Sequence, residues 1–160
     1  MAYSGKYKIK NRHKYRGDAD NVIYRSLWEK KAFIWCEDNS EIKWWASEEL
    51  AIQYFYEVDK RHHRYFPDLV IEFNNGKRLM VEIKPKKETR KPEFKGRKTK
   101  RYINESVTFV KNMNKWEAAS KVAKDNGWEF QIWTEETLQK MGILPKKIKS
   151  LKPLKPLKTK

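Results

Sequence analysis

Asp68, Glu82 and Lys84 are the residues of this sequence whose types and spacing best suit catalysis. Two carboxylates at facing positions repel each other, and a cation between them relieves that repulsion. Mg²⁺ prefers a few carboxylate oxygens and keeps several of its waters. Such a metal lowers the pKa of one water and stabilises the leaving oxygen of a phosphodiester, while a nearby lysine stabilises charge on the phosphate. The three residues therefore suit metal-dependent phosphodiester hydrolysis, provided that the fold brings them together.

A predicted β-hairpin over residues 69–83 has the turn chemistry to do this. Its two apolar strands flank Asn74-Asn75-Gly76, which favours either a two-residue turn or a three-residue loop with its glycine in the left-handed region. The three-residue loop gathers the apolar side chains on one face and pairs Glu72 with Arg78 across the strands. We therefore expect the register set by the longer loop.

In that register Asp68 lies opposite Glu82, and Lys84 lies two residues further on the same face. The alternative for an isolated basic hairpin is an exposed salt bridge between Asp68 and Lys84, with Glu82 in solvent. Other features of the sequence are needed to distinguish a metal site from a surface ion pair.

The elements around the hairpin predict an α/β fold with a mixed sheet flanked by helices. Apolar residues at helical spacing begin at Tyr24, Ser26 and Glu29 have capping-box spacing, and the helix should end near residues 38–39. A second helix is expected over 105–125, before the stop signal Asn126-Gly127. The remaining predicted elements are strands at 42–46, 50–56, 69–73, 77–83 and 128–134, and a short helix at 135–141.

Polar and basic segments lie between and outside these elements. We expect residues 1–20 to form a basic N-terminal arm, residues 21–143 to form the folded domain, and the Lys/Pro-rich residues 144–160 to be a disordered tail. Residues 60–64 are interpreted as a basic turn. Residues 85–101 are interpreted as a basic loop, tethered beside the proposed metal site and suited to DNA phosphates.

The composition narrows the partners and excludes several chemistries. The net charge is +16, which favours contact with nucleic acid. Cys36 is the single cysteine, so an intramolecular disulfide is excluded, and it is expected to be a small core residue. No apolar run could cross a bilayer, no secretory signal is present, and no Gly-rich loop indicates a nucleotide cofactor. His62 and His63 lack the further ligands that a zinc site needs.

The motif Pro67-Asp68 followed by Glu82-Ile83-Lys84 resembles the PD-(D/E)xK pattern of restriction-like endonucleases. Longer stretches are similar to the head-completion nucleases of tailed phages, and two of them also resemble the endonuclease subunit of cut-and-paste transposons. These stretches include Tyr24-Arg25-Ser26-Leu27-Trp28-Glu29, Ser47-Glu48-Glu49, His63-Arg64-Tyr65-Phe66-Pro67-Asp68, Val81-Glu82-Ile83-Lys84-Pro85, Lys98-Thr99-Lys100-Arg101-Tyr102, Lys115-Trp116-x-Ala118-Ala119 and Gly127-Trp128-Glu129-Phe130.

This resemblance implies an αβββαβ core and a Mg²⁺-dependent cut in DNA, with Mn²⁺ as a substitute. It implies that Glu29 completes a metal site with Asp68, Glu82 and Ile83, although Glu29 could equally be the capping partner of Ser26 or an ordinary surface acid. The implied task is to process DNA ends in the infected cytoplasm, so that a phage head, with its capsid or neck proteins, can accept a tail. The side chains expected to contact DNA, by structure or by ends, are Arg25, Arg64, Lys86, Lys87, Arg90, Lys98, Lys100, Arg101 and Lys115.

Two alternatives stay open at this point. One is a transposon-end or junction-cleaving nuclease on the same core. The other is a DNA-binding virion-assembly protein that keeps the fold without catalysis.

Overall fold

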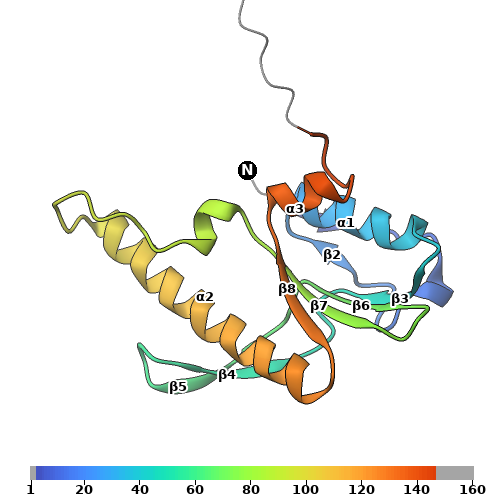
Figure 1. Cartoon of the computed structure of the whole chain (residues 1–160), viewed down its shortest axis with the longest axis horizontal. Coiled ribbons are helices and arrows are strands. Elements are labelled where there is room, and N and C mark those ends of the chain that lie inside the picture. Colours follow the sequence, from blue (N-terminus) through green and yellow to red (C-terminus); the bar gives the residue numbers. More distant parts are fainter. Residues whose placement is uncertain (1–2, 147–160) are drawn as a thin grey trace, which may run out of the picture.

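A four-stranded mixed sheet organises the chain, and the computed structural model describes residues 3–146. The strand order is β3-β6-β7-β8, in which β8 runs parallel to β7 and the other pairs are antiparallel (Figure 1). The elements are β1 (Gly5–Lys6), η1 (Arg12–Lys14), β2 (Ile23–Tyr24), α1 (Leu27–Asp38), β3 (Ile42–Ala46), β4 (Ile52–Tyr56), β5 (Arg61–Tyr65), β6 (Leu69–Phe73), β7 (Arg78–Ile83), η2 (Lys86–Thr89), α2 (Lys100–Asp125), β8 (Glu129–Trp133) and α3 (Glu135–Lys140).

The β6–β7 hairpin has the predicted register. Glu72 pairs with Arg78 and Leu69 with Val81, and Gly76 adopts φ 88°, the left-handed conformation that the three-residue loop requires. The Arg78 guanidinium donates to Glu72 Oε1 at 2.7 Å, which adds a cross-strand ion pair to the ladder. The turn chemistry and the apolar pattern were therefore sufficient to predict this part of the fold.

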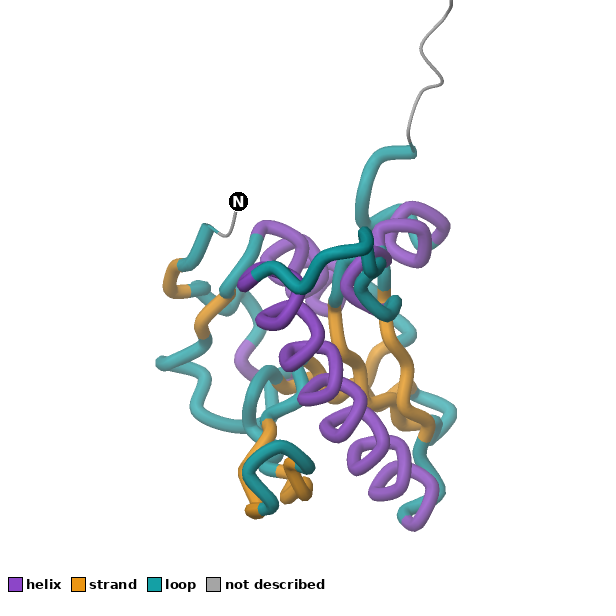
Figure 2. The backbone as a smooth tube through the Cα atoms, turned by 90° about the vertical axis from the view of Figure 1, so that its left-hand side faces the viewer, coloured by secondary structure: helices purple, strands orange, loops and turns teal. Residues whose placement is uncertain are grey.

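Helices cover both faces of the sheet. On one face, Phe33 of α1 packs against Trp45 of β3 at 5.1 Å between ring centroids, and Trp35 packs edge-on against Trp133 of β8 at 5.8 Å. α3 lies on the same side as α1 (Figure 1). α2 crosses the other side in front of the strands (Figure 2) and buries Trp116. A sheet covered in this way has apolar residues on both of its faces, which confirms the predicted mixed α/β architecture.

The ends of the two long helices follow from their caps. The Ser26 hydroxyl accepts from the Glu29 N–H at 3.2 Å, and α1 ends at Asp38 as predicted. α2 begins at Lys100, earlier than the predicted residue 105, because the Thr99 hydroxyl accepts from the Tyr102 N–H at 3.0 Å. The last residues of the predicted basic loop therefore belong to the first turn of α2.

Residues 61–64 belong to β5 and only Lys60 lies in the turn before it, so the prediction of a basic turn over residues 60–64 was wrong for all but its first residue. β5 pairs antiparallel with β4, and Tyr54 and Tyr65 of this β4–β5 hairpin are buried against the molecule while Arg64 is exposed. His62 and Arg64 lie on the solvent face of this two-stranded ribbon, whereas His63 lies on the same face as Tyr65 and stacks on Tyr54. The basic composition of the strand conceals this alternation. The hairpin lies alongside α2, apart from the main sheet (Figure 1).

The N-terminal segment packs against the domain rather than extending from it as the expected arm. Tyr7 and Tyr15 are buried, and Tyr15 meets the Trp45 ring edge-on at 4.8 Å. These two aromatic side chains supply apolar area that outweighs the basic character of the segment. The expected disordered tail falls largely on residues 147–160, outside the described residues. No helix within residues 3–146 is both long and apolar enough to cross a membrane.

Candidate active site

The end of the β6–β7 hairpin brings Asp68 and Glu82 together. Asp68 precedes β6, and its Oδ2 accepts from the Ile83 N–H at 2.7 Å. Glu82 lies on β7 beside it and is only 7 % exposed. The proximity that the register predicted is therefore present, and an exposed ion pair with Glu82 in solvent is excluded.

Burial and mutual repulsion leave both carboxylates unfavourable as anions. Burial raises the pKa of Asp68 well above its usual range, and the charges of Glu82 and Glu29 raise it further. Burial also raises the pKa of Glu82, although a hydrogen bond from Tyr65 and the charges of two lysines oppose the shift. Paired, desolvated carboxylates of this kind are the environment that a divalent cation would stabilise.

Lys84 lies on the same side of β7 as Glu82. Its Nζ is 3.9 Å from Glu82 Oε1, and its backbone N–H donates to the Trp133 carbonyl at 3.0 Å. The second contact extends the pairing of β7 with β8 by one residue, so the lysine is held by the sheet and not by a loop. A half-buried ammonium at this point can face a phosphate that approaches the two carboxylates.

Glu29 is brought to the same region by α1. It is 5 % exposed, its Oε2 accepts from the Arg25 N–H at 3.1 Å, and its Oε1 is buried without any hydrogen-bond partner. Burial raises its pKa, and its charge acts on Asp68. The Glu29 N–H donates to the Ser26 hydroxyl, but the Glu29 carboxylate accepts from Arg25 and not from the Ser26 N–H, so only one half of the predicted capping box is present. The carboxylate lies near the hairpin pair, and its role as a metal ligand stays a prediction.

Tyr65 is a site residue whose role the sequence did not reveal. Its hydroxyl donates to Glu82 Oε2 at 2.5 Å from the end of β5, and both side chains are buried. Burial raises the pKa of the Tyr65 hydroxyl, so it remains a donor. The Lys115 ammonium lies 5.6 Å from the centroid of the same ring, which brings α2 to the site. The only sequence signal was the position of Tyr65 within the quoted His63–Asp68 stretch.

The donors present fit Mg²⁺ better than a metal that needs a full set of protein ligands. Within residues 3–146, no three His, Cys, Asp or Glu side chains lie close enough together to hold a metal by themselves. Mg²⁺ is usually held by one or two carboxylates and keeps its remaining sites for water and substrate phosphate. Ile83, predicted as a further ligand, can offer only its backbone carbonyl oxygen, because Mg²⁺ takes oxygen ligands. Its N–H donates to Asp68. The unpartnered Glu29 Oε1 is consistent with a third, outer carboxylate.

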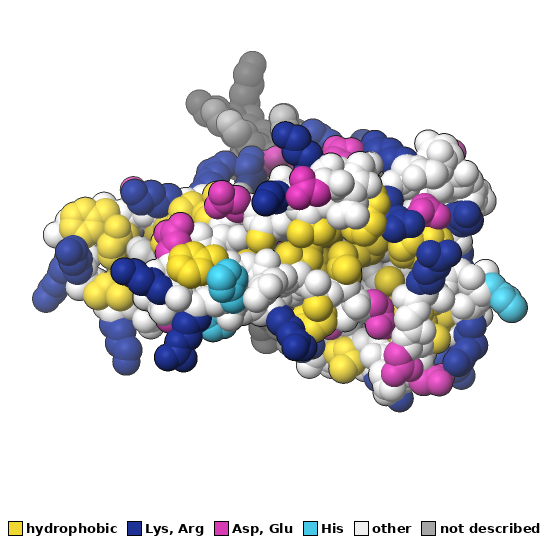
Figure 3. Space-filling model, turned by 90° about the horizontal axis from the view of Figure 1, so that it is seen from below, with side chains coloured by type: hydrophobic (Ala, Val, Ile, Leu, Met, Phe, Trp, Pro, Cys, Tyr) yellow, Lys and Arg dark blue, Asp and Glu magenta, His cyan; other side chains and the backbone are white. Residues whose placement is uncertain are grey.

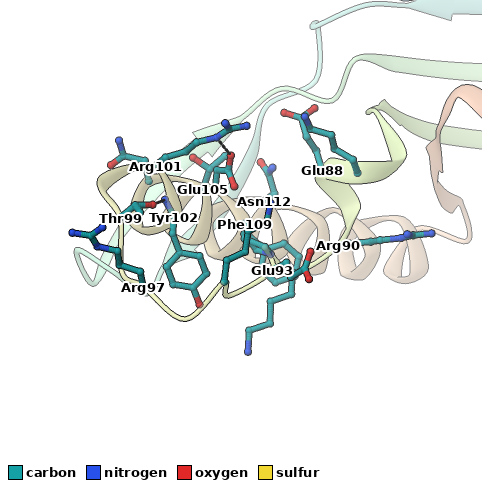
Figure 4. Close-up of a pocket in the computed structure, with 16 residues that line it drawn as sticks. Glu88, Arg90, Glu93, Arg97, Thr99, Arg101, Tyr102, Glu105, Phe109 and Asn112 are labelled. Carbon is teal, nitrogen blue, oxygen red and sulfur yellow. Dashed lines mark hydrogen bonds and ion pairs between the residues drawn. The ribbon is translucent and has the colours of Figure 1, made fainter.

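The predicted DNA contacts are dispersed. Lys87, Arg90 and Arg101 line a cavity of about 1030 Å³ between the loop after η2 and the first half of α2 (Figure 4). In this cavity the Arg101 Nε donates to Glu105 at 2.9 Å. Lys98 and Lys100 are exposed nearby. Lys and Arg side chains extend along the projecting part of the molecule formed by α2 and the β4–β5 hairpin (Figure 3).

The other predicted contacts have protein partners or lie elsewhere. The Arg25 Nε donates to Glu48 at 2.8 Å, and the Lys86 Nζ donates to Glu136 of α3 at 2.7 Å. Arg64 is exposed on β5. Of the nine predicted residues, Lys115 and Arg25 lie near the carboxylates: the charges of Glu82 and Asp68 act on Lys115, and those of Glu29 and Asp68 act on Arg25.

Comparison with known proteins agrees with this arrangement. Residues 39–135 match the family described as the N-terminal domain of TnsA-like endonucleases, and this range contains Asp68, Glu82 and Lys84 but not Glu29. The head completion nuclease of Enterobacteria phage T4 is 43 % identical to this chain over 147 residues, which cover 89 % of this chain and 98 % of that protein.

Proposed function

This chain belongs to the TnsA-like endonuclease family, and on that premise we propose that it is a Mg²⁺-dependent DNA endonuclease. The observation that carries the proposal is the pair Asp68 and Glu82, which lies beside Lys84 at the end of a hairpin and is buried enough to raise the pKa of both carboxyl groups. A protein with no use for a cation would gain stability from a neutral or apolar residue at either position.

Asp68 and Glu82 are the residues that would hold the metal, with Glu29 behind them. When bound, Mg²⁺ would supply a water of lowered pKa and a counter-charge for the leaving oxygen. The Ile83 N–H orients the Asp68 carboxylate through the 2.7 Å hydrogen bond, and Tyr65 orients Glu82. Lys84 would stabilise the charge that develops on the scissile phosphate.

The basic cavity and the projecting part of the molecule would position the DNA. The lysines and arginines there suit phosphate contacts, which fix the position of the duplex but read no sequence. We therefore expect DNA recognition that depends on structure or on ends rather than on base sequence.

The biological role follows from the relative named as a head completion nuclease. We propose that this chain processes DNA ends during phage head completion, before the tail attaches, in contact with capsid or neck proteins. Sedimentation of the tagged protein with DNA-filled heads tests this role. Sedimentation with filled heads but not with empty ones supports it, whereas absence from both contradicts it.

The enzymatic proposal is tested by cleavage of linear, flapped and Y-shaped DNA with Mg²⁺. The variants are Glu82→Gln, which keeps the shape of the side chain, and Lys84→Gln, which removes the charge and shortens the side chain by one atom. Lys121→Gln on the exposed side of α2 is the control. We expect the wild type and the control to cut, and the two site variants to bind DNA without cutting. A wild type that binds DNA but never cuts with Mg²⁺ or Mn²⁺ would favour an assembly protein that keeps the fold without catalysis.

A further inference from the structure

Two lysines of α2 lie on the tyrosine face of the β4–β5 hairpin. The Lys115 Nζ is 5.6 Å from the Tyr65 ring centroid and 6.0 Å from that of Tyr54. One helical turn earlier, the Lys111 Nζ is 5.5 Å from the Tyr56 ring centroid. Cation–π contacts of this length hold an ammonium group in place without neutralising it.

Neither lysine is neutralised by an acidic partner. Among the described residues, no carboxylate lies within 4.0 Å of the ammonium group of Lys111 or Lys115. Glu57, which follows β4, accepts from the Asn114 side chain of the same helix at 3.1 Å. Both ammonium groups are therefore held in place by rings and keep their charge available for another anion.

Lys115 adds a second lysine to the active centre. The charges of Glu82, Asp68, Lys84 and Lys111 all act on it, and it is half-buried. Three cations thus lie in sequence from the end of β7 along α2: Lys84, Lys115 and Lys111. Like charges at helical spacing of four residues destabilise a helix, so this arrangement is costly unless an anion approaches it.

We propose that Lys115 and Lys111 form a phosphate track, in which Lys115 holds a DNA phosphate at or next to the scissile one and Lys111 holds the next phosphate along the same strand. The inference rests on the proposed nuclease function, which supplies the DNA strand that passes Asp68 and Glu82. Lys115 contributes to the chemical step because it acts beside Lys84. Lys111 contributes to affinity because it lies one turn further from the carboxylates.

A purely structural role for Lys115 makes different predictions. If its stem only covers the rings of Tyr54 and Tyr65, loss of its charge would leave the rate at saturating DNA unchanged. A phosphate contact would instead be restored in part by Lys115→Arg, which keeps the charge. If Lys115 contacts a phosphate, Lys115→Gln should also lower the slope of log affinity against log salt by about one.

The test is a cycle between protein variants and neutralised phosphates. Once the wild-type cut is mapped, single methylphosphonates replace each phosphate on either side of it. We expect Lys115→Gln to slow single-turnover cleavage by about 10²-fold, on the scale of losing one charge-stabilising donor. At one phosphate, a methylphosphonate should slow the wild type but leave the rate of Lys115→Gln unchanged. Lys111→Gln should weaken binding and be insensitive at the neighbouring phosphate. Lys121→Gln should behave as wild type.

The same combinations of variants and methylphosphonates are also compared by equilibrium DNA affinity, with Ca²⁺ in place of Mg²⁺. This second readout does not depend on cleavage. If the losses of affinity caused by the lysine variant and by the methylphosphonate multiply at every phosphate, the two changes act independently. That result overturns the track. A wild type that never cuts, but whose binding shows the coupling at adjacent phosphates, rejects the nuclease proposal and supports the track. Lys115→Gln that cuts at the wild-type rate overturns the role of Lys115 in the chemical step.

Discussion

Replacing Tyr65 with phenylalanine isolates one hydrogen bond at the active centre. The change removes only the hydroxyl that donates to Glu82 Oε2 at 2.5 Å and leaves the ring beneath Lys115. Because Tyr65 and Glu82 are both more than nine-tenths buried, solvent cannot replace the lost donor. The Glu82 carboxylate then loses both a hydrogen bond and its fixed orientation.

The expected size follows from that burial. A hydrogen bond to a charged group contributes about 1.5–3 kcal/mol to the free energy of unfolding. For a chain of this length, each kcal/mol shifts the melting temperature by about 2–4 °C, so Tyr65→Phe should melt about 3–12 °C below the wild type. Loss of an outer hydrogen-bond partner of a metal ligand weakens metal affinity or activity by about 10–100-fold.

The assay combines thermal unfolding without metal, Mg²⁺ titration by calorimetry, and the pre-steady-state cleavage rate. Tyr7→Phe is the matched control, because the Tyr7 hydroxyl donates to Glu37 Oε2 at 2.6 Å away from the active centre. We expect the control to lose stability with unchanged Mg²⁺ affinity and rate. If Tyr65→Phe binds Mg²⁺ and cuts as the wild type does, Tyr65 does not position Glu82.

Two further predictions concern the fold that carries the site. Tyr15→Ala should lower the free energy of unfolding by about 3–5 kcal/mol, the usual cost of deleting a buried aromatic side chain, because Tyr15 packs on Trp45. Denaturant unfolding measures this loss. A loss under about 1 kcal/mol, as expected of an unpacked arm, would contradict the packing. Thr99→Ala should cost about 1 kcal/mol through loss of the α2 cap and speed amide exchange in the first turn of the helix; unchanged exchange there would mean that the cap does not define where α2 begins.

The sequence predicted those parts of the molecule that local rules control. Gly76 and the cross-strand pair Glu72 and Arg78 defined one register, and that register brought Asp68 to Glu82. The caps and stop signals of the helices are also local. The main error in the predicted helix bounds is the start of α2, because the basic composition of residues 98–101 concealed the Thr99 cap.

The sequence could not predict contacts that depend on distant residues. Tyr65 and Lys115 reach Glu82 from β5 and α2, and no spacing along the chain indicates that these elements meet there. Counting charges also could not show that Arg25 and Lys86 have acidic partners 23 and 50 residues away in the chain, and their contacts with DNA stay predictions. The metal role of Glu29 came from the resemblance and stays a prediction.

The proposed function requires that Asp68 and Glu82 hold a divalent metal for DNA cleavage. The most direct measurement is Mg²⁺ binding by calorimetry to metal-free wild type, Asp68→Asn and Glu82→Gln, with folding of each checked by circular dichroism. We expect the wild type to bind Mg²⁺ and both folded variants to lose that binding. Wild type that binds no Mg²⁺ even in the presence of DNA, or variants that bind it equally well, would contradict the proposed function.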